Sequence, residues 1–313
     1  MGAVFDAIGV FFEQLTSVGW KSLGLAVLAH LVKTCCTSRA WWNVLGAAYP
    51  EERPRWRTVH GSYVSGVGVN AIVPARGGDA VRLFLAHRAI PGAKYTTLAS
   101  TLLVMTIFDS TAALLIFAYA LTLGVLPSIT ALGSLPGFEF GWVFSNRAFA
   151  VVLFTSLAIV AFFGFFWIRF RIRDFRERVT QGLAVLADRR QYLRTVAAWQ
   201  AGDWALRFVA IWFFLGAFGI EQSIQNVLLV QVTQSLATLV PVSPGGIGTE
   251  QAFIVYVFRD SVVSRSRLIS YSVGMKVTLT VVNAIVGFTA LFLMLGHVRW
   301  RELGGGERPA TGT

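Results

Sequence analysis

The chain has 313 residues, of which 55% are hydrophobic and only 14% are charged. In soluble domains about 25% of the residues are charged. The composition therefore excludes an ordinary soluble domain and predicts an integral membrane protein. The net charge of +11 would also suit a nucleic-acid-binding protein, but the basic residues fall in short loops between apolar spans. That distribution favours positive-inside topology and contact with anionic lipid, so we expect a lipid partner and no nucleic acid.

The N-terminal part predicts a helix on the membrane surface and then a first span. Apolar residues on one face of residues 1–17 indicate an amphipathic helix lying at the interface. Residues 18–36 form the first span, and Lys33 near its far end is expected to extend its side chain to the headgroups. Cys35 and Cys36 are adjacent within this span and imply neither a disulfide framework nor a metal site. Basic residues and aromatic anchors then mark the cytoplasmic side: Arg39, Arg53, Arg55, Arg57, Trp41, Trp42 and Trp56.

A segment too short to cross the membrane follows. Residues 61–75 are uncharged, but at about 1.5 Å per residue they fall short of a hydrocarbon core of roughly 30 Å. We therefore predict that the segment enters and returns, with a break at Pro74 and a new helix from Asp79. Asn70 is a polar group that needs a partner at this depth. The first predicted repeat, residues 18–124, ends with a long span whose only ionisable group is Asp109.

The linking region is predicted to cover residues 125–195. It contains an external loop, an uncharged span at residues 148–168, and the most basic loop of the chain at residues 169–194. This loop is cytoplasmic by the positive-inside rule.

A second predicted repeat covers residues 196–297. Its first span contains Asp203 and Arg207, which share a helical face because they are four residues apart, and which can pair. Residues 222–258 contain a second break from Pro241 to Gly248, and residues 268–295 form the last span. The remaining residues, 298–313, are predicted to form a disordered cytoplasmic tail.

The two breaks resemble each other. Each reads Val-Pro, then Gly-Gly, then an acidic residue in the first turn of the next helix, at residues 73–79 and 240–250. Matched interruptions in two halves are typical of a transporter with a site near the midplane, so the fold prediction is all-α and polytopic, with about six to eight membrane segments in two inverted repeats. Arg259, Arg265 and Arg267 would then lie on the external side. The alternative is one kinked crossing for residues 222–258, with an external C-terminus.

The predicted site is a polar cavity for an anion. Broken helices persist in hydrocarbon only where protein or a cavity satisfies their backbone groups, and a restarting helix offers free N–H groups and a positive dipole end. Arginine geometry suits a phosphate. The candidate substrate-binding residues are Asn70, Arg76, Asp79, Arg82, Asp109, Asp203, Arg207, Gly245, Gly246, Gly248, Glu250 and Lys276.

Structural roles are the alternative for several of these residues. Asp79 and Glu250 can complement a helix dipole, Asp203 and Arg207 can form a structural pair, and Lys276 can reach the headgroups. No P-loop, HExxH or GxSxG motif is present, and the four histidines form no cluster in the sequence. We therefore expect no catalytic residue, no metal and no cofactor.

The two broken segments carry a family resemblance. NAIVPARGGDAVR at residues 70–82 and PVSPGGIGTEQA at residues 241–252 resemble the signature stretches of the lysylphosphatidylglycerol synthase transmembrane region, a flippase-like family. In its two-part members a similar membrane region moves aminoacylated phospholipid, and a separate soluble domain makes it. This chain has no room for that domain, so the resemblance implies translocation. Met105 and Thr106 stand where the family usually has Glu-Arg before the Asp109 position, which implies a different lipid if that pair binds an aminoacyl headgroup.

The leading functional hypothesis is a lipid translocator for an anionic phospholipid or a polyprenyl-phosphate-linked lipid. We expect it in a bacterial plasma membrane, with a cytoplasmic C-terminus. Two alternatives stay open: a membrane-embedded lipid-modifying transferase with Asp79 or Glu250 as the base, and a non-transporting partner of an envelope-lipid complex. A homo-oligomer, or a complex with a biosynthetic partner, is also compatible with the sequence.

Overall fold

The computed structural model describes residues 18–73, 77–122, 172–239, 249–258 and 263–304. Throughout these residues the regular elements are helical and no strand occurs, which confirms the all-α prediction. The predicted interfacial helix, the span at residues 148–168 and the central residues of both breaks lie outside the described ranges.

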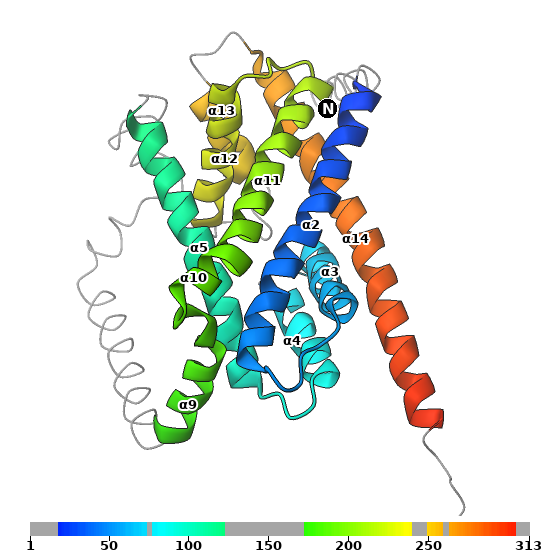
Figure 1. The fold of residues 1–313 in the computed structure, drawn as a ribbon. Coiled ribbons are helices and arrows are strands. Elements are labelled where there is room, and N and C mark those ends of the chain that lie inside the picture. Colours follow the sequence, from blue (N-terminus) through cyan, green and yellow to red (C-terminus); the bar gives the residue numbers. More distant parts are fainter. Residues whose placement is uncertain (1–17, 74–76, 123–171, 240–248, 259–262, 305–313) are drawn as a thin grey trace, which may run out of the picture.

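Four long helices run along the molecule in Figure 1: α2 (Trp20–Ala48), α5 (Tyr95–Thr122), α11 (Ala198–Ala217) and α14 (Arg265–Gly304). α2 continues well past the predicted end at residue 36, because no proline interrupts it before Pro50. α14 also continues into residues that the sequence assigned to a disordered tail. Among the described residues, two helical stretches are long and apolar enough to cross a membrane, Tyr95–Ile116 and Arg265–Gly296.

The first break forms the tip of a helical hairpin. α3 (Trp56–Ile72) packs against α4 (Gly77–Ala89). α3 ends at Ile72 because Val73, which precedes a proline, takes an extended conformation with ψ of 122°. The two helices approach so closely that a Cβ atom on Gly78 would lie 1.9 Å from the carbonyl oxygen of Gly66.

The second break belongs to a hairpin toward the opposite end of the molecule (Figure 1). Its helices are α12 (Ile224–Leu239) and α13 (Thr249–Val257), and they pack against each other. Val227 near the start of α12 and Phe258 just after α13 belong to the same buried cluster. The chain therefore turns back on itself between them, which a single kinked rod would not do.

Two apolar clusters bury the opposite ends of the long helices. One joins the end of α2 to the start of α3, the end of α4 and the start of α5, through Ala48, Val59, Ile90 and Leu98. The other joins the start of α2 to the end of α11, the outer ends of the second hairpin and the start of α14, through Ala26, Leu215, Val227, Phe258 and Leu268. Each hairpin therefore begins and ends at one cluster, and the two hairpins use different clusters.

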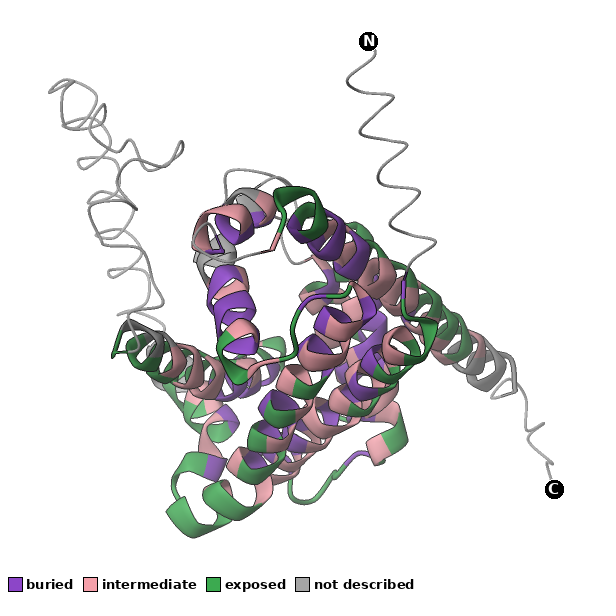
Figure 2. Ribbon diagram, turned by 90° about the horizontal axis from the view of Figure 1, so that it is seen from above, coloured by how far each residue is buried: buried purple, intermediate pink, exposed green. Residues whose placement is uncertain are grey.

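Buried residues face the interior of the helical assembly, and exposed residues its periphery (Figure 2). The outer face of α14 carries a stripe of exposed apolar side chains at helical spacing: Val277, Val281, Ile285, Phe288 and Phe292. Such a stripe fits contact with lipid tails.

The basic segment between residues 169 and 194 lies beside the first cluster. It contains α9 (Ile172–Gly182), the short helix η1 (Ala184–Leu186) and α10 (Arg189–Tyr192), and leads through η2 (Leu193–Ala197) into α11. α9 packs against α5, and the Gln181 side chain donates a hydrogen bond to the Ala48 carbonyl at the end of α2 over 2.9 Å. This end of the molecule is therefore the strongly basic one.

Candidate functional site

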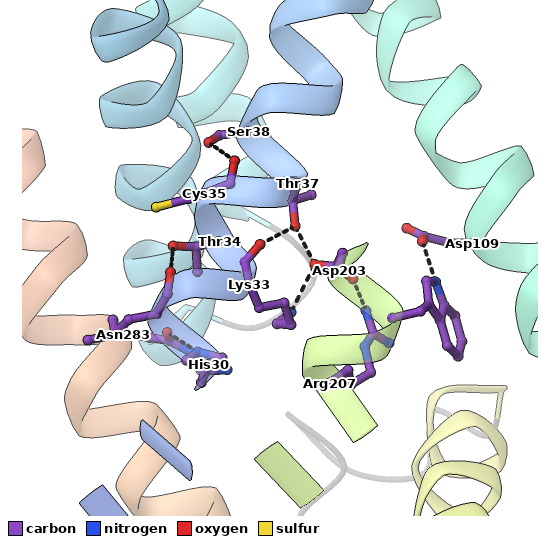
Figure 3. Close-up of polar contacts among 12 residues, drawn as sticks. His30, Lys33, Thr34, Cys35, Thr37, Ser38, Asp109, Asp203, Arg207 and Asn283 are labelled. Carbon is purple, nitrogen blue, oxygen red and sulfur yellow. Dashed lines mark hydrogen bonds and ion pairs between the residues drawn. The ribbon is translucent and has the colours of Figure 1, made fainter. Parts of the chain in front are cut away.

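A charged layer crosses the middle of α2 and α11, between the two apolar clusters (Figure 3). Asp203, whose side chain is only 5% exposed, is paired with Lys33 at 3.6 Å and with Arg207 at 3.3 Å. The Thr37 hydroxyl also donates to Asp203. The predicted Asp203–Arg207 pair is confirmed. The prediction that Lys33 extends to the headgroups is wrong, because its ammonium group turns inward to a buried carboxylate.

Asp109 joins this layer through an aromatic side chain. The indole N–H of Trp204 donates to Oδ1 of Asp109 over 3.0 Å, and the Arg207 guanidinium lies over the same indole, 4.5 Å from its centroid. Among the described residues no cation pairs directly with Asp109. The layer therefore holds one carboxylate that is fixed in place without a counter-ion.

α2 also reaches α14 from this layer. His30 and Asn283 form a side-chain hydrogen bond of 2.8 Å. His30, Lys33 and Thr37 lie on one face of α2, because they are spaced by three and four residues. This face therefore carries polar contacts to two different helices.

Arg82 of α4 is a buried guanidinium without hydrogen-bond partners at two of its nitrogens. It lies between two aromatic rings, 3.9 Å from the centroid of Trp41 and 4.9 Å from that of Tyr63. Its Nε and Nη2 atoms are buried, and no described residue accepts from them. A buried charge without a partner is costly, and a desolvated cation–π contact offsets only about 2 kcal/mol. Arg82 is therefore suited to bind an anion, which would accept hydrogen bonds from its two unpartnered nitrogens.

Trp41 corrects another prediction. The sequence placed it at the membrane interface, but it is fully buried, and its indole donates to the Thr101 hydroxyl over 3.0 Å. Trp41 therefore supports Arg82 inside the protein.

The tip of the first hairpin brings Asn70 to the start of α4. The Asn70 side-chain oxygen accepts from the Gly78 backbone N–H over 2.7 Å, which supplies the partner that the sequence required. Asp79 lies in the first turn of α4 and forms no ion pair with any described residue. Arg76 lies outside the described residues.

The tip of the second hairpin holds a buried carboxylate. Glu250, in the first turn of α13, pairs with Lys276 of α14 at 3.3 Å, so Lys276 points inward. Next to it, the Gln251 side chain donates to the Ser272 hydroxyl over 3.2 Å. The three predicted glycines of this break, Gly245, Gly246 and Gly248, lie outside the described residues.

Both hairpins contact the middle of α14. A Cβ on Gly68 of α3 would lie 2.6 Å from the Cα of Gly287, so these helices touch at their backbones. Glu250 contacts Lys276, which lies about three turns, or roughly 16 Å, earlier on α14. The segments next to the two breaks are therefore anchored on one helix, at points roughly 16 Å apart.

Sequence reasoning missed several members of the site. Thr37, His30 and Trp204 gain their roles only through the packing of α2 against α11 and α14. The polar spacing of His30, Lys33 and Thr37 in an apolar span was the available signal. No cluster of three histidine, cysteine or acidic side chains that could hold a metal occurs in the ranges that the structure covers.

Comparison with known proteins gives one match. A search of curated proteins found no similar sequence. The family described as the lysylphosphatidylglycerol synthase TM region matches residues 4–287, a stretch that includes both breaks and the charged layer. The resemblance read from the two broken segments is thereby confirmed. The chain belongs to the lysylphosphatidylglycerol synthase TM region family, and is a membrane protein related to lipid metabolism or translocation.

Proposed function

We propose that the protein translocates a phosphate-bearing lipid, an anionic phospholipid or a polyprenyl-phosphate-linked lipid, across the membrane. The observation that carries the proposal is the charged layer of Lys33, Asp203 and Arg207 between two apolar clusters. Ionisable groups within the membrane-spanning part of a protein are energetically costly, and they commonly mark substrate or ion pathways. A headgroup that crosses the bilayer needs such a polar layer.

Arg82 is the proposed seat of the phosphate. Its unpartnered nitrogens leave donors for a bidentate contact, which guanidinium geometry favours over an ammonium group. Lys33 of α2 and Arg207 of α11 would add positive charge for the headgroup, and Asp109 would balance that charge or receive a cationic part of the lipid.

The proposed mechanism is alternating access between two inverted repeats, residues 18–124 and 196–297. It is supported by the two hairpins, which return to opposite apolar clusters as re-entrant segments from opposite membrane faces would. Arg267, one of the arginines that this topology places on the external side, has a structural explanation. Arg267 donates to the Gly219 carbonyl after α11 over 3.3 Å, so it stabilises a helix end on the external side.

Reconstituted vesicles test the proposal. We expect the purified chain to move labelled phosphatidylglycerol or a labelled polyprenyl-phosphate lipid between leaflets, and the Arg82→Met variant to be inactive. If the chain moved neither lipid class, the proposal would be overturned. The proposal contains no covalent step, so mass spectrometry of lipids from cells with and without the gene should find the same species. A species that disappears with the gene would instead support a transferase.

A further inference from the structure

Two arginines lie on one tryptophan at the basic end of α2. The guanidinium carbon of Arg39 is 4.1 Å from the ring centroid of Trp42, and that of Arg53 is 3.8 Å from the same centroid. Arg39 belongs to α2, whereas Arg53 belongs to the connection between α2 and α3. We call this group of three residues the Trp42 clamp.

The clamp is fixed by the surrounding chain. The Trp42 indole N–H donates to the Pro54 carbonyl over 2.7 Å, which sets the orientation of the ring. A Cβ on Gly46 would lie 2.8 Å from Nε of Arg53, so the Arg53 side chain occupies space that any other residue at position 46 would fill. The hydrogen bond fixes the ring, and the absence of a side chain at Gly46 leaves room for the Arg53 guanidinium beside it.

The charges of the clamp are not neutralised within the described part of the chain. Neither arginine forms an ion pair there, and the neighbouring acids Glu51 and Glu52 are exposed and form none either. Stacking on an indole uses the flat face of a guanidinium and leaves its N–H groups at the edge available. Because both guanidinium carbons lie within 4.1 Å of one centroid, the two groups occupy opposite faces of the indole, and each presents N–H groups that can donate charge-assisted hydrogen bonds to a phosphate at the ring edge.

We propose that the Trp42 clamp binds the phosphate of an anionic lipid in the leaflet at the basic end of the molecule. A lipid rather than free phosphate is favoured, because tryptophan belts and basic residues next to membrane helices both lie at the headgroup level. The clamp is separate from the charged layer, since its residues contact neither Arg82 nor Asp203 in any described interaction. It does not depend on the proposed translocation.

Native mass spectrometry of the full chain in detergent tests the proposal, with phosphatidylglycerol, phosphatidylcholine and inorganic phosphate as separate probes. The Arg39→Gln/Arg53→Gln variant should bind phosphatidylglycerol about tenfold more weakly than the unaltered chain. The control Arg55→Gln/Arg57→Gln loses the same charge from exposed positions nearby and should change binding less than about twofold. Gly46→Ala should weaken binding without removing any charge, by displacing Arg53.

Three outcomes would overturn the proposal. Equal losses in the two double variants would mean that net charge alone attracts the lipid. Displacement of phosphatidylglycerol by an equal concentration of inorganic phosphate would assign the clamp to free phosphate. Unchanged phosphatidylglycerol binding in both Gly46→Ala and the Arg39→Gln/Arg53→Gln variant would show that the clamp holds no lipid. Arg82→Met should keep full binding at the clamp while losing translocation, so failure of one proposal does not imply failure of the other.

Discussion

Lys33 and Asp203 meet at 3.6 Å although they lie on different helices far apart in the sequence. The side chains are 14% and 5% exposed, so both charges have lost most of their water. Such a pair rarely adds net stability, because desolvation offsets the attraction between the charges. The Lys33–Asp203 pair lies in the layer through which we propose that a headgroup passes. A functional role therefore explains this pair better than a contribution to stability does.

Removing Asp203 should destabilise the protein strongly. Asp203→Ala removes the counter-ion of Lys33 and Arg207, which are only partly buried, so the expected loss in the free energy of unfolding is about 3 kcal/mol, the low end of the range for breaking a buried pair. Lys33→Met/Asp203→Leu should lose less than Asp203→Ala alone, because no paired charge is orphaned at position 33. Chemical denaturation in mild detergent measures both. Glu52→Gln, at an exposed position, serves as the control, and effects of Lys33 and Asp203 that simply add would contradict the pairing.

Arg82 should show the opposite relation between stability and function. Arg82→Met removes an unsatisfied buried charge while keeping a long side chain between the rings of Trp41 and Tyr63. We expect an unfolding temperature equal to or above that of the parent, together with loss of lipid movement in vesicles. Arg88→Met on the exposed face of α4 is the matched control and should keep activity. A large fall in unfolding temperature for Arg82→Met would indicate a structural role for this guanidinium.

The tip of the first hairpin should tolerate no side chain at position 78. Gly78→Ala places a methyl group against the Gly66 carbonyl and should lower the unfolding temperature by several degrees. Gly24→Ala is the control, because nothing lies within 4 Å of a Cβ there and alanine favours a helix by about 0.5–1 kcal/mol. Differential scanning fluorimetry compares the two, and equal behaviour would contradict the close approach of α3 and α4.

The pair at the second hairpin predicts a rescue. Lys276→Met leaves Glu250, whose side chain is only 9% exposed, without its cationic partner and should lower both stability and lipid movement. Adding Glu250→Gln removes the orphaned charge and should restore stability without restoring movement. Measuring the unfolding temperature and vesicle activity of both variants separates a structural pair from a functional one, and recovery of movement in the double variant would exclude Glu250 from the lipid path.

If both ends of the second hairpin lie on the same side of the membrane, cysteines introduced at these ends should show the same labelling. Glu221→Cys and Ser264→Cys, introduced after Cys35 and Cys36 are changed to serine, should react with a membrane-impermeant maleimide from the same side of sealed vesicles. Glu51→Cys, at the other end of α2, should react only from the opposite side. Labelling of Glu221→Cys and Ser264→Cys from different sides would mean that residues 222–258 cross the membrane once.

Local sequence patterns predicted many of the helices and one ion pair. They could not predict contacts between helices that are distant in the sequence. The hairpins were predictable because proline and glycine act on the backbone next to them, and the Asp203–Arg207 pair because four residues make one helical turn. Lys33 could not be assigned correctly, since its partner is fixed only when α2 packs against α11. The prediction for Trp41 was wrong for a similar reason. The sequence alone does not distinguish a tryptophan that faces the headgroups from one that packs against a buried arginine.

The contacts of α14 have a mechanical consequence. The backbones of α14 and α3 are in direct contact at Gly287 and Gly68, and the ion pair with Glu250 links Lys276 of α14 to α13. A shift of α14 along its axis would therefore carry both hairpins' contacts in the same direction at once. Because the two hairpins return to opposite apolar clusters, such a shift would move α14 toward the tip of one hairpin and away from the tip of the other.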